Sequence, residues 1–320
     1  MASKRRSGNR GEFFSPRAAV PLGIIVSMIA PENAHVSVPR QRWSKGQRSD
    51  GEDELVVEEP IEYQIGGAPV ATVMRTPGHD RDLAIGFFFC EGWITGQEDI
   101  GSLRLCESKA TENASPSPAA NVLDLIPSST ASIPTVQSTR AGPVTSSCGV
   151  CGKQTIGEIL ASVPPLATGA PPTPKESGDE MTVQASTIAG LTEELGARQP
   201  LFVRTGALHA AGIFTLTGEV VVVREDIGRH NAVDKVIGHC VRKLGLSRDA
   251  GPQGHALMVS GRVSFEIVQK ALRARIPLIV AVSGVSSLAV DLATRGGVTV
   301  CGFSRDQTFT AYTHPARIRW

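Results

Sequence analysis

The sequence predicts an α/β protein, with a mixed or parallel sheet flanked by helices and a smaller N-terminal subdomain made of a hairpin and a helix. Continuous runs of Val, Ile and Leu alternate with helix-like segments from residue 210 to residue 313. This alternation is typical of strands that helices cover on both faces. A separate hairpin pattern and a helix-like run lie between residues 55 and 94. With 320 residues, the chain is long enough for one large domain or two small ones.

The N-terminal subdomain is predicted from two neighbouring patterns. LVVEEPIEYQIGGAPVATVMRT, residues 55–76, predicts two strands that turn at Gly66 and Gly67, because glycine adopts the positive φ angles of a tight hairpin turn. HDRDLAIGFFFCEGWI, residues 79–94, has apolar side chains at helical spacing behind a polar start. We therefore expect a helix that packs on the hairpin.

Loop-like composition dominates the middle of the chain. Residues 107–147 and 164–179 are rich in Ser, Thr, Pro and Ala, with one strand-like run at 121–126. A short helical run, QTIGEILASV, covers residues 154–163.

The second half of the chain predicts the main sheet. A hairpin is expected over residues 210–226 with its turn at Thr217 and Gly218, and a helix over residues 230–245. Further strands are expected at 255–261, 277–284, 298–303 and 308–313, with helices at 264–274 and 286–297. Because the strands are continuous apolar runs, we expect the sheet to be largely parallel.

Two of these strands end in the same way. MVSGRVSFE and AVSGVSSLA both pass from an apolar strand through Ser-Gly to a helix whose first turn is rich in serine. Free backbone amides and the helix dipole at such a junction favour an anion such as phosphate. The alternative is that Ser264 and Ser286 only cap their helices.

A dense set of polar residues marks the start of the helix that begins near residue 230. In REDIGRHNAVDK, residues 224–235, Asp226, His230 and Asp234 recur at intervals of four, accompanied by Arg229, Asn231 and Lys235. The pattern fits a binding site beside the two Ser-Gly junctions. It also fits an N-cap at Asp226 followed by solvated pairs on an exposed helix. A metal site is disfavoured, because no second histidine stands at a matching interval.

Composition excludes some classes of protein. Hydrophobic residues make up 41%, charged residues 20%, and the net charge is +1, so nothing indicates a nucleic-acid or membrane-surface protein. No run approaches the ~18 apolar residues that span a bilayer. Basic residues before AAVPLGIIVSMIA outline a signal peptide, but Pro21 and Gly23 interrupt it. We expect a disordered leader at 1–54, the N-terminal subdomain with its loose loop at 55–145, and the α/β domain at 146–320.

The cysteines favour a reducing compartment. They occupy positions 90, 106, 148, 151, 240 and 301, and only one pair is close in sequence. Small secreted disulfide scaffolds place their cysteines differently, so we expect reduced thiols and a cytoplasmic protein.

The close pair, Cys148 and Cys151 in TSSCGVCGKQ, admits three chemistries. A structural zinc site needs four ligands, and the chain has neither a second CxxC nor a close pair of histidines, so we expect no metal. A thioredoxin-like dithiol would follow a core strand, whereas loop-like residues precede Cys148. A mobile thiol that carries sulfur fits the flanking glycines and Lys153, whose charge lowers a thiol pKa. The second cysteine would release the sulfur by thiol exchange.

Five segments together resemble the successive signatures of the FdhD family of formate dehydrogenase accessory sulfurtransferases. They are EEPIEYQIGGAPVATVMRTPGHDRDLAIGFFFCEGWI, SSCGVCGK, REDIGRHNAVDKVIG, SGRVSFEIVQKA and GFSRDQTFTAYT, and the resemblance spans roughly residues 55–315. It implies a cytidine-deaminase-like fold without zinc chemistry, and a homodimer. It also implies that sulfur from a cysteine desulfurase travels as a persulfide to Mo-bis(molybdopterin guanine dinucleotide), before this cofactor enters formate dehydrogenase.

The resemblance also assigns residues. Cys148 is the persulfide cysteine and Cys151 its partner. The cofactor site maps onto Phe303, Ser304, Arg305, Asp306, Gln307 and Thr308. Because a guanine dinucleotide carries pyrophosphates, Arg262 and Arg305 are candidate anchors beside the helix starts; the alternative for Arg305 is a plain surface arginine.

Two loops depart from the family pattern. TGALH has Ala207 where the family usually has glycine, and SGVS stands at 283–286 where it usually has S-A-P-T. His209 and both cysteines remain. Two further functions stay open: a chaperone that binds and hands over the molybdenum cofactor without sulfur chemistry, and a dithiol oxidoreductase with a reversible bond between Cys148 and Cys151.

Overall fold

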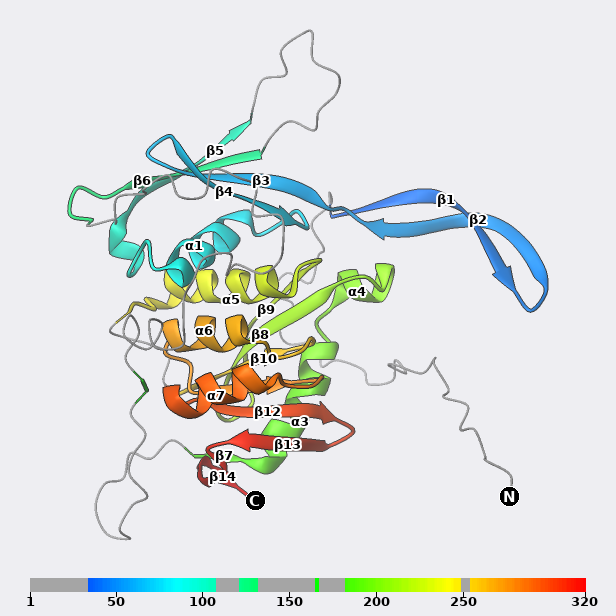
Figure 1. The fold of residues 1–320 in the computed structure, drawn as a ribbon. Helices are drawn as coiled ribbons and strands as arrows, with labels where there is room; N and C mark the ends of the chain where they lie inside the picture. Colours follow the sequence, from blue (N-terminus) through cyan, green and yellow to red (C-terminus); the bar gives the residue numbers. More distant parts are fainter. Residues whose placement is uncertain (1–33, 108–120, 132–164, 167–181, 249–253) are drawn as a thin grey trace.

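The computed structural model describes residues 34–107, 121–131, 165–166, 182–248 and 254–320. Three β-structures follow one another along the chain: a projecting hairpin, a four-stranded sheet and a six-stranded sheet with helices (Figure 1). A fourth, two-stranded sheet pairs Val183–Gln184 with Ile318–Arg319 in parallel. The predicted cysteine pair and the predicted helix at 154–163 lie outside the described residues. Among the helices that the structure describes, none has the length and apolarity needed to cross a bilayer.

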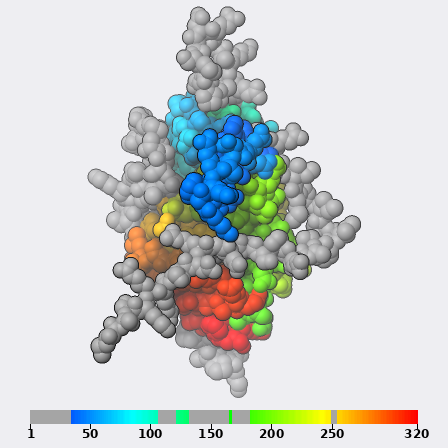
Figure 2. All heavy atoms as spheres, turned by 90° about the vertical axis from the view of Figure 1, so that its right-hand side faces the viewer, coloured from blue at the N-terminus to red at the C-terminus, as the bar shows by residue number. Residues whose placement is uncertain are grey.

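The projecting hairpin consists of β1 (His35–Ser44) and β2 (Gln47–Val56). Its antiparallel register runs from the pair His35 and Val56 to the turn at Lys45 and Gly46, where φ is 48° and 83°. The hairpin extends away from the body in Figure 1 and faces the viewer, in blue, in Figure 2. The expectation of a leader without structure up to residue 54 is therefore wrong for residues 35–54. Both faces of the hairpin are mostly exposed, so its strands lack the apolar alternation that marks a half-buried strand.

The four-stranded sheet has the order β4-β3-β6-β5. Its strands are β3 (Glu59–Ile65), β4 (Ala68–Arg75), β5 (Ile100–Glu107) and β6 (Asn121–Pro127). Gly66 and Gly67 turn β3 into β4 with φ of 59° and 82°, which confirms the predicted turn. Helix α1 (Asp80–Glu91) packs on this sheet through aromatic side chains, with the ring centroid of Tyr63 5.1 Å from that of Phe87.

The six-stranded sheet has the order β13-β12-β11-β10-β8-β9. Its strands are β8 (His209–Thr215), β9 (Val220–Asp226), β10 (His255–Val259), β11 (Leu278–Ala281), β12 (Thr299–Arg305) and β13 (Thr308–Thr313). Among the described strands of this sheet, only β10, β11 and β12 pair parallel to one another, and the other pairs are antiparallel, so the sheet is mixed rather than largely parallel. Helical crossovers join these three strands, whereas tight turns close β8–β9 and β12–β13 and force antiparallel pairing.

Helices cover both faces of this sheet, as the apolar strands predict. Helices α5 (Arg229–Leu244), α6 (Phe265–Arg273) and α7 (Ser287–Gly296) lie on one face, and α3 (Ala185–Gly196) lies on the other (Figure 1). Along β10, Leu257 packs into the core of the first face, while Ala256 and Met258 pack with α3. The smaller elements are α4 (Pro200–Thr205), the strands β7 (Val183–Gln184) and β14 (Ile318–Arg319), and the 3-10 helices η1 (Gln97–Asp99) and η2 (Pro315–Arg317).

Two glycines bring the small sheet's helix against the main domain. A β-carbon on Gly86 of α1 would collide with the backbone carbonyl of Asp234 in α5, and one on Gly238 of α5 would collide with the carbonyl of Asp82. The two helices therefore pack backbone to backbone, and α1 lies between the small sheet and α5 (Figure 1). The α/β architecture agrees with the prediction, whereas the finer likeness to cytidine deaminases stays a prediction.

Candidate functional site

Three helices begin at one edge of the six-stranded sheet. Helices α6 and α7 start just after the carboxyl ends of β10 and β11, and α5 starts at Arg229, three residues after β9 ends. Strand β9 ends at this same edge, because its last residue, Asp226, pairs with His209 at the start of β8. Figure 1 shows the turn between β12 and β13 at this edge, on the right of the view. Helix N-termini supply free amides and positive potential, so the edge favours anions.

The two Ser-Gly junctions are joined to each other. Val263 and Val285 form an isolated parallel bridge, in which the Val263 amide donates to the Gly284 carbonyl at 3.0 Å. The Ser286 amide donates back to the Val263 carbonyl, also at 3.0 Å. Hydrogen bonds therefore fix the starts of α6 and α7 side by side.

The start of β8 is hydrogen-bonded to the first of these two junctions. The Ala210 amide donates to the Ser260 hydroxyl at 2.9 Å, and the Ser260 amide donates to the Ala210 carbonyl at 2.9 Å. A β-carbon on Gly261 would lie 3.5 Å from His209 Nδ1 and 3.7 Å from Arg229 side-chain carbons. His209, Gly261 and Arg229 are therefore in close contact at the edge.

The polar start of α5 is buried rather than solvated. Asp226 is 0% exposed, and its carboxylate accepts from the Gly228 amide at 2.8 Å and from Asn231 Nδ2 at 2.9 Å. Lys235 Nζ lies 2.7 Å from Asp226 Oδ2 and also donates to the Thr76 carbonyl at 3.0 Å. The alternative of solvated pairs is therefore wrong, and so is the N-cap at Asp226, because Gly228 occupies the N-cap position.

His230 links α5 to the start of α6. Its Nε2 lies 3.2 Å from the Ser264 hydroxyl and 3.0 Å from Glu266 Oε2, and its Nδ1 has no hydrogen-bond partner among the described residues. Ser264 makes no side-chain cap, whereas the Ser286 hydroxyl accepts from the Ala289 amide at 3.3 Å. Only Ser286 is thus the plain cap that the sequence allowed for both serines.

The predicted cofactor segment forms the end of the β12–β13 hairpin. Phe303 is 44% exposed, and its amide donates to the Ser283 carbonyl at 3.0 Å, which places it beside the second Ser-Gly junction. Ser304 is 0% exposed and turns toward α3, where its hydroxyl lies 3.0 Å from the Thr192 hydroxyl. Asp306 and Gln307 form the turn with φ of 51° and 57°.

The other side chains of this segment differ in what they contact. Gln307 Nε2 donates to Glu193 Oε1 at 2.8 Å, the Thr308 hydroxyl donates to the Arg305 carbonyl at 2.9 Å, and the Arg305 side chain is exposed. Of the six predicted residues, Phe303 lies against the junctions, Arg305 to Thr308 form the exposed end, and Ser304 faces the opposite side of the sheet.

Cationic groups gather at this edge. Burial lowers the pKa of His209, and the charges of Arg229, His230 and Arg262 lower it further. Arg262 is exposed just beyond the first Ser-Gly junction. The described part of the chain contains no group of three or more His, Cys, Asp or Glu side chains that is arranged to hold a metal ion. The edge is suited to hold phosphate groups through helix N-termini and arginines.

The two departures from the family pattern lie at the same edge. Gly284, within SGVS, lies against the ring of Phe303, since a β-carbon there would come within 3.1 Å of the ring atom Cζ. Glycine at this position therefore lets the aromatic ring approach the junction. Ala207 is exposed two residues before His209.

Three buried thiols of the described residues do not suit sulfur transfer. Cys90, Cys240 and Cys301 are free and buried. Burial raises the pKa of the Cys240 and Cys301 thiols to about 12 and raises that of Cys90 as well. Such thiols remain protonated near neutral pH and are poor nucleophiles. The predicted pair, Cys148 and Cys151, lies outside the described residues.

Sequence reasoning missed several residues that build the edge. Thr76 binds the buried ion pair from the N-terminal subdomain, Thr192 holds Ser304 from α3, and Glu266 contacts His230. Glu266 stands two residues after Ser264, a position that signals the first turn of a helix. No local pattern marks the two threonines, because each meets its partner across more than a hundred residues.

The fold and the edge together define an α/β protein with a cationic, anion-receptive rim where three helices begin. Comparison with known proteins identifies the family: the FdhD/NarQ family model matches residues 56–319, and the chain belongs to this family. The Mycobacterium tuberculosis H37Rv protein named "Sulfur carrier protein FdhD" is 44% identical over 265 residues, covering 82% of this chain and 91% of that protein. A protein of the same name from Anaeromyxobacter dehalogenans 2CP-1 is 42% identical over 271 residues, covering 83% and 88%.

A solved structure shares the fold. The crystal structure of a candidate formate dehydrogenase accessory protein from Desulfotalea psychrophila superposes with a TM-score of 0.65. It covers 89% of this chain and 100% of that one at 24% sequence identity. At this identity the likeness supports the α/β fold alone.

Proposed function

We propose that the protein is a sulfurtransferase that carries sulfur as a persulfide on Cys148 and delivers it to a molybdenum cofactor required by formate dehydrogenase. The observation that carries the proposal is membership of a family whose curated relatives are named sulfur carriers. The low reactivity of Cys90, Cys240 and Cys301 adds support, because buried and protonated thiols are poor sulfur carriers.

The proposed reaction has two thiol exchanges. The Cys148 thiolate attacks the outer sulfur of a persulfide on a cysteine desulfurase, so that a new S–S bond forms and the donor thiolate leaves. At the acceptor, the Cys151 thiolate attacks Cys148 Sγ, a disulfide forms, and hydrosulfide leaves toward the metal. The two electrons that reduce the sulfur come from the two cysteines, so a dithiol reductant must restore the pair for the next cycle.

The cofactor acceptor is proposed to be Mo-bis(molybdopterin guanine dinucleotide), bound as a substrate at the edge. Helix N-termini of α5, α6 and α7 would face its pyrophosphates, with Arg262 and Arg305 as charged partners. Phe303 is exposed beside Gly284 and offers an aromatic surface to a guanine ring. The partners of the cycle are the desulfurase and formate dehydrogenase, and the protein is expected to act as a homodimer.

A second candidate is a chaperone that binds and hands over the cofactor without sulfur chemistry. One observation favours it: the edge consists of helix N-termini and exposed arginines, which are groups that bind phosphate anions. In this case the cysteine pair would be structural.

Complementation separates the two functions. In cells that lack their own copy of this gene, the parent chain should restore formate dehydrogenase activity, and Cys148→Ala should abolish it while the variant still binds the cofactor. Full activity with Cys148→Ala would refute sulfur transfer and favour the chaperone. A substitution of buried Cys301 by Ala is the matched control, and it should leave activity in place.

A further inference from the structure

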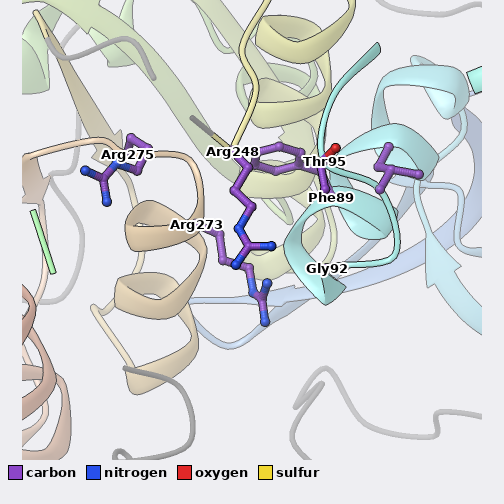
Figure 3. Close-up of a pocket in the computed structure, with 7 residues that line it drawn as sticks. Phe89, Gly92, Thr95, Arg248, Arg273 and Arg275 are labelled. Atoms are coloured by element: carbon purple, nitrogen blue, oxygen red, sulfur yellow. The ribbon is translucent and has the colours of Figure 1, made fainter. Parts of the chain in front are cut away.

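Two features of the described residues lie outside the candidate site: a small pocket and the projecting hairpin. The pocket lies between the ends of α1 and α6 and measures about 40 Å³, which holds only a few waters (Figure 3). In Figure 3 the side chains of Arg248 and Arg273 run together while Arg275 is turned away from them, and each of the three already has an interaction partner. The pocket therefore offers no place for a protein partner, whereas the hairpin offers an open surface.

The hairpin of β1 and β2, which we call the arm, is rooted beside the candidate site. Its last residue, Val56, packs against a small buried cluster that includes Leu201 of α4, and Ile227, in the loop before α5, packs against the same cluster. The Arg204 guanidinium also binds the Glu54 carboxylate, with Nε 2.9 Å from Oε2. The arm is therefore held at its base, and it projects on the side of the molecule where the candidate edge lies (Figures 1 and 2).

Charges on the arm are separated by sign. The tip, residues 40–48, contains four cationic side chains and no carboxylate. The neck, residues 35–39 and 50–56, contains four carboxylates and neither lysine nor arginine. The cations of the tip are Arg40, Arg42, Lys45 and Arg48, and the carboxylates of the neck are Asp50, Glu52, Asp53 and Glu54. The arm therefore has a positive end and a negative base.

These charges are only partly neutralised within the arm. Arg48 Nη2 lies 3.5 Å from Asp50 Oδ1, and an exposed pair at this distance contributes little. Among the described residues, neither Arg42 nor Lys45 forms an ion pair, and the same holds for Glu52. Unmatched charges of both signs therefore remain, positive at the tip and negative in the neck.

One face of the arm combines these charges with apolar surface. Cross-strand pairs place Trp43 opposite Arg48 in the tip and Pro39 opposite Glu52 in the neck. The two pairs share a face, because they are four residues apart along each strand. Trp43 is 74% exposed, and Pro39 is exposed as well. An isolated two-stranded hairpin is only marginally stable in water, so a partner that covers this face would stabilise the arm.

We propose that the arm pairs with the arm of a second copy of this chain, face to face and antiparallel about a two-fold axis near Gln41. Such an axis places the tip of each arm on the neck of the other. Trp43 then lies on the partner's Pro39, and Arg48 approaches the partner's Glu52. Tryptophan and arginine are among the residue types most enriched at the energetic centres of protein interfaces. The inference rests on the homodimer of the proposed function and assigns its surface.

The separation of charges favours a second copy over a purely acidic or basic protein. An acidic surface that covered the arm would attract the tip but would be repelled by the neck, and a basic surface would be repelled by the tip. A surface with the two signs in separate bands is complementary to its own two-fold copy, which is what a contact between identical patches requires.

Sedimentation velocity of the full-length protein, over a range of concentrations at low and at high salt, tests the proposal. We expect a dimer whose dissociation constant rises with salt, because screening weakens the attraction between exposed charges. Trp43→Ser should raise the dissociation constant about tenfold or more, since it removes the main apolar contact of the tip.

A charge exchange tests the antiparallel pairing. The tip variant carries Lys45→Glu and Arg48→Glu, and the neck variant carries Asp50→Lys and Glu52→Lys. Each variant alone should be monomeric, because residues 48 and 52 then carry charges of the same sign. An equimolar mixture of the two should form a mixed dimer, because the signs are opposite again between the two chains. This recovery also shows that both variants fold.

Lys243→Glu combined with Arg295→Glu is the matched control. It changes the net charge as much as the tip variant does, at exposed positions outside the arm, and it should dimerise like the parent. Loss of the dimer in this control would show a general effect of charge and would overturn the proposal.

Three other results would also overturn it. A mixture that stays monomeric contradicts the exchange, and tip and neck variants that dimerise like the parent show that the copies meet through another surface. A parent chain that is monomeric at every concentration refutes the homodimer as well, and indicates that another protein or another segment of this chain covers the arm. The loading of Cys148 with sulfur is measured separately, so sulfur transfer stands or fails on its own.

Discussion

Lys235 and Asp226 form a buried ion pair beneath the edge, with Nζ 2.7 Å from Oδ2 and exposed fractions of 1% and 0%. The same ammonium group donates to the Thr76 carbonyl at 3.0 Å, while the Thr76 amide donates to the Asp226 carboxylate at 3.2 Å. The pair therefore holds three segments together: the end of β9, the first turns of α5 and the loop after β4. It couples the N-terminal subdomain to the domain that carries the candidate site.

Lys235→Met is expected to destabilise the protein by about 3–5 kcal/mol, because it leaves the Asp226 carboxylate buried without its counter-charge. Urea unfolding followed by circular dichroism measures the loss. Lys243→Met, at the exposed end of the same helix, is the matched control and should change stability by no more than about 0.5 kcal/mol. Equal effects from the two substitutions would contradict the structural role of the pair.

Gly86→Ala should destabilise the protein by about 1–3 kcal/mol or more. The added methyl group would collide with the Asp234 carbonyl and force α1 and α5 apart. Gly190→Ala is the control, because Gly190 lies in α3 and a β-carbon there meets nothing within 4 Å. That substitution should stabilise the protein by up to about 1 kcal/mol through helix propensity. Thermal unfolding of the two variants distinguishes close packing from a general effect of alanine.

Asp82 predicts a stability change at acid pH. Burial alone would raise its pKa, but hydrogen bonds from His239 and Arg242, with the charges of Arg242 and Arg224, lower it from 3.8 to about 2. The folded form therefore binds this proton less readily than the unfolded chain. The stability that Asp82 contributes is present above pH 3.8 and is lost as the pH falls toward 2. The loss is on the order of 2 kcal/mol.

Asp82→Asn checks this assignment. The variant should be destabilised near neutral pH, because Arg224 and Arg242 lose their shared carboxylate. It should also lose part of the acid-induced fall in stability, which urea unfolding at about pH 5 and about pH 2.5 would measure. An identical pH dependence in parent and variant would show that other carboxylates cause the fall.

Much of the fold follows from local sequence patterns. The turn at Gly66 and Gly67, helix α1 and the alternating elements after residue 209 all appear where periodicity and turn residues predict them. Strand direction does not follow from the same patterns, because a strand buried on both faces has the same continuous apolar run in a parallel or an antiparallel pair. The β1–β2 hairpin was not predicted, because both of its faces are mostly exposed and its sequence therefore lacks the apolar alternation of a half-buried strand.

The assembly of the anion-receptive edge could be predicted from the sequence, whereas the contacts among its side chains could not. The Ser-Gly junctions and the polar start of α5 lie together at one edge, since strand ends and helix starts meet there in any such sheet. Whether Asp226 and Lys235 are solvated or buried depends on α1 and the loop after β4, which pack over them from another subdomain. The inward direction of Ser304 likewise depends on Thr192, which no local pattern connects to it.

Arg262→Gln should weaken cofactor binding at the edge by about tenfold, the loss expected when one charged hydrogen-bond partner of a phosphate is removed. GDP, which carries a pyrophosphate, is a suitable probe for calorimetry. Arg295→Gln keeps the same net charge as this variant but lies outside the edge, so it should bind GDP like the parent. A loss of affinity in both variants would indicate general charge rather than a site.

Peptide mass spectrometry of the protein loaded by a cysteine desulfurase and free cysteine tests the central claim most directly. The account predicts one additional sulfur atom on the peptide that contains Cys148, removable by a reductant and absent from Cys148→Ala. It also predicts no added sulfur on buried Cys90, Cys240 or Cys301. Loading that leaves Cys148 unmodified, or that modifies the protein equally in Cys148→Ala, would contradict it.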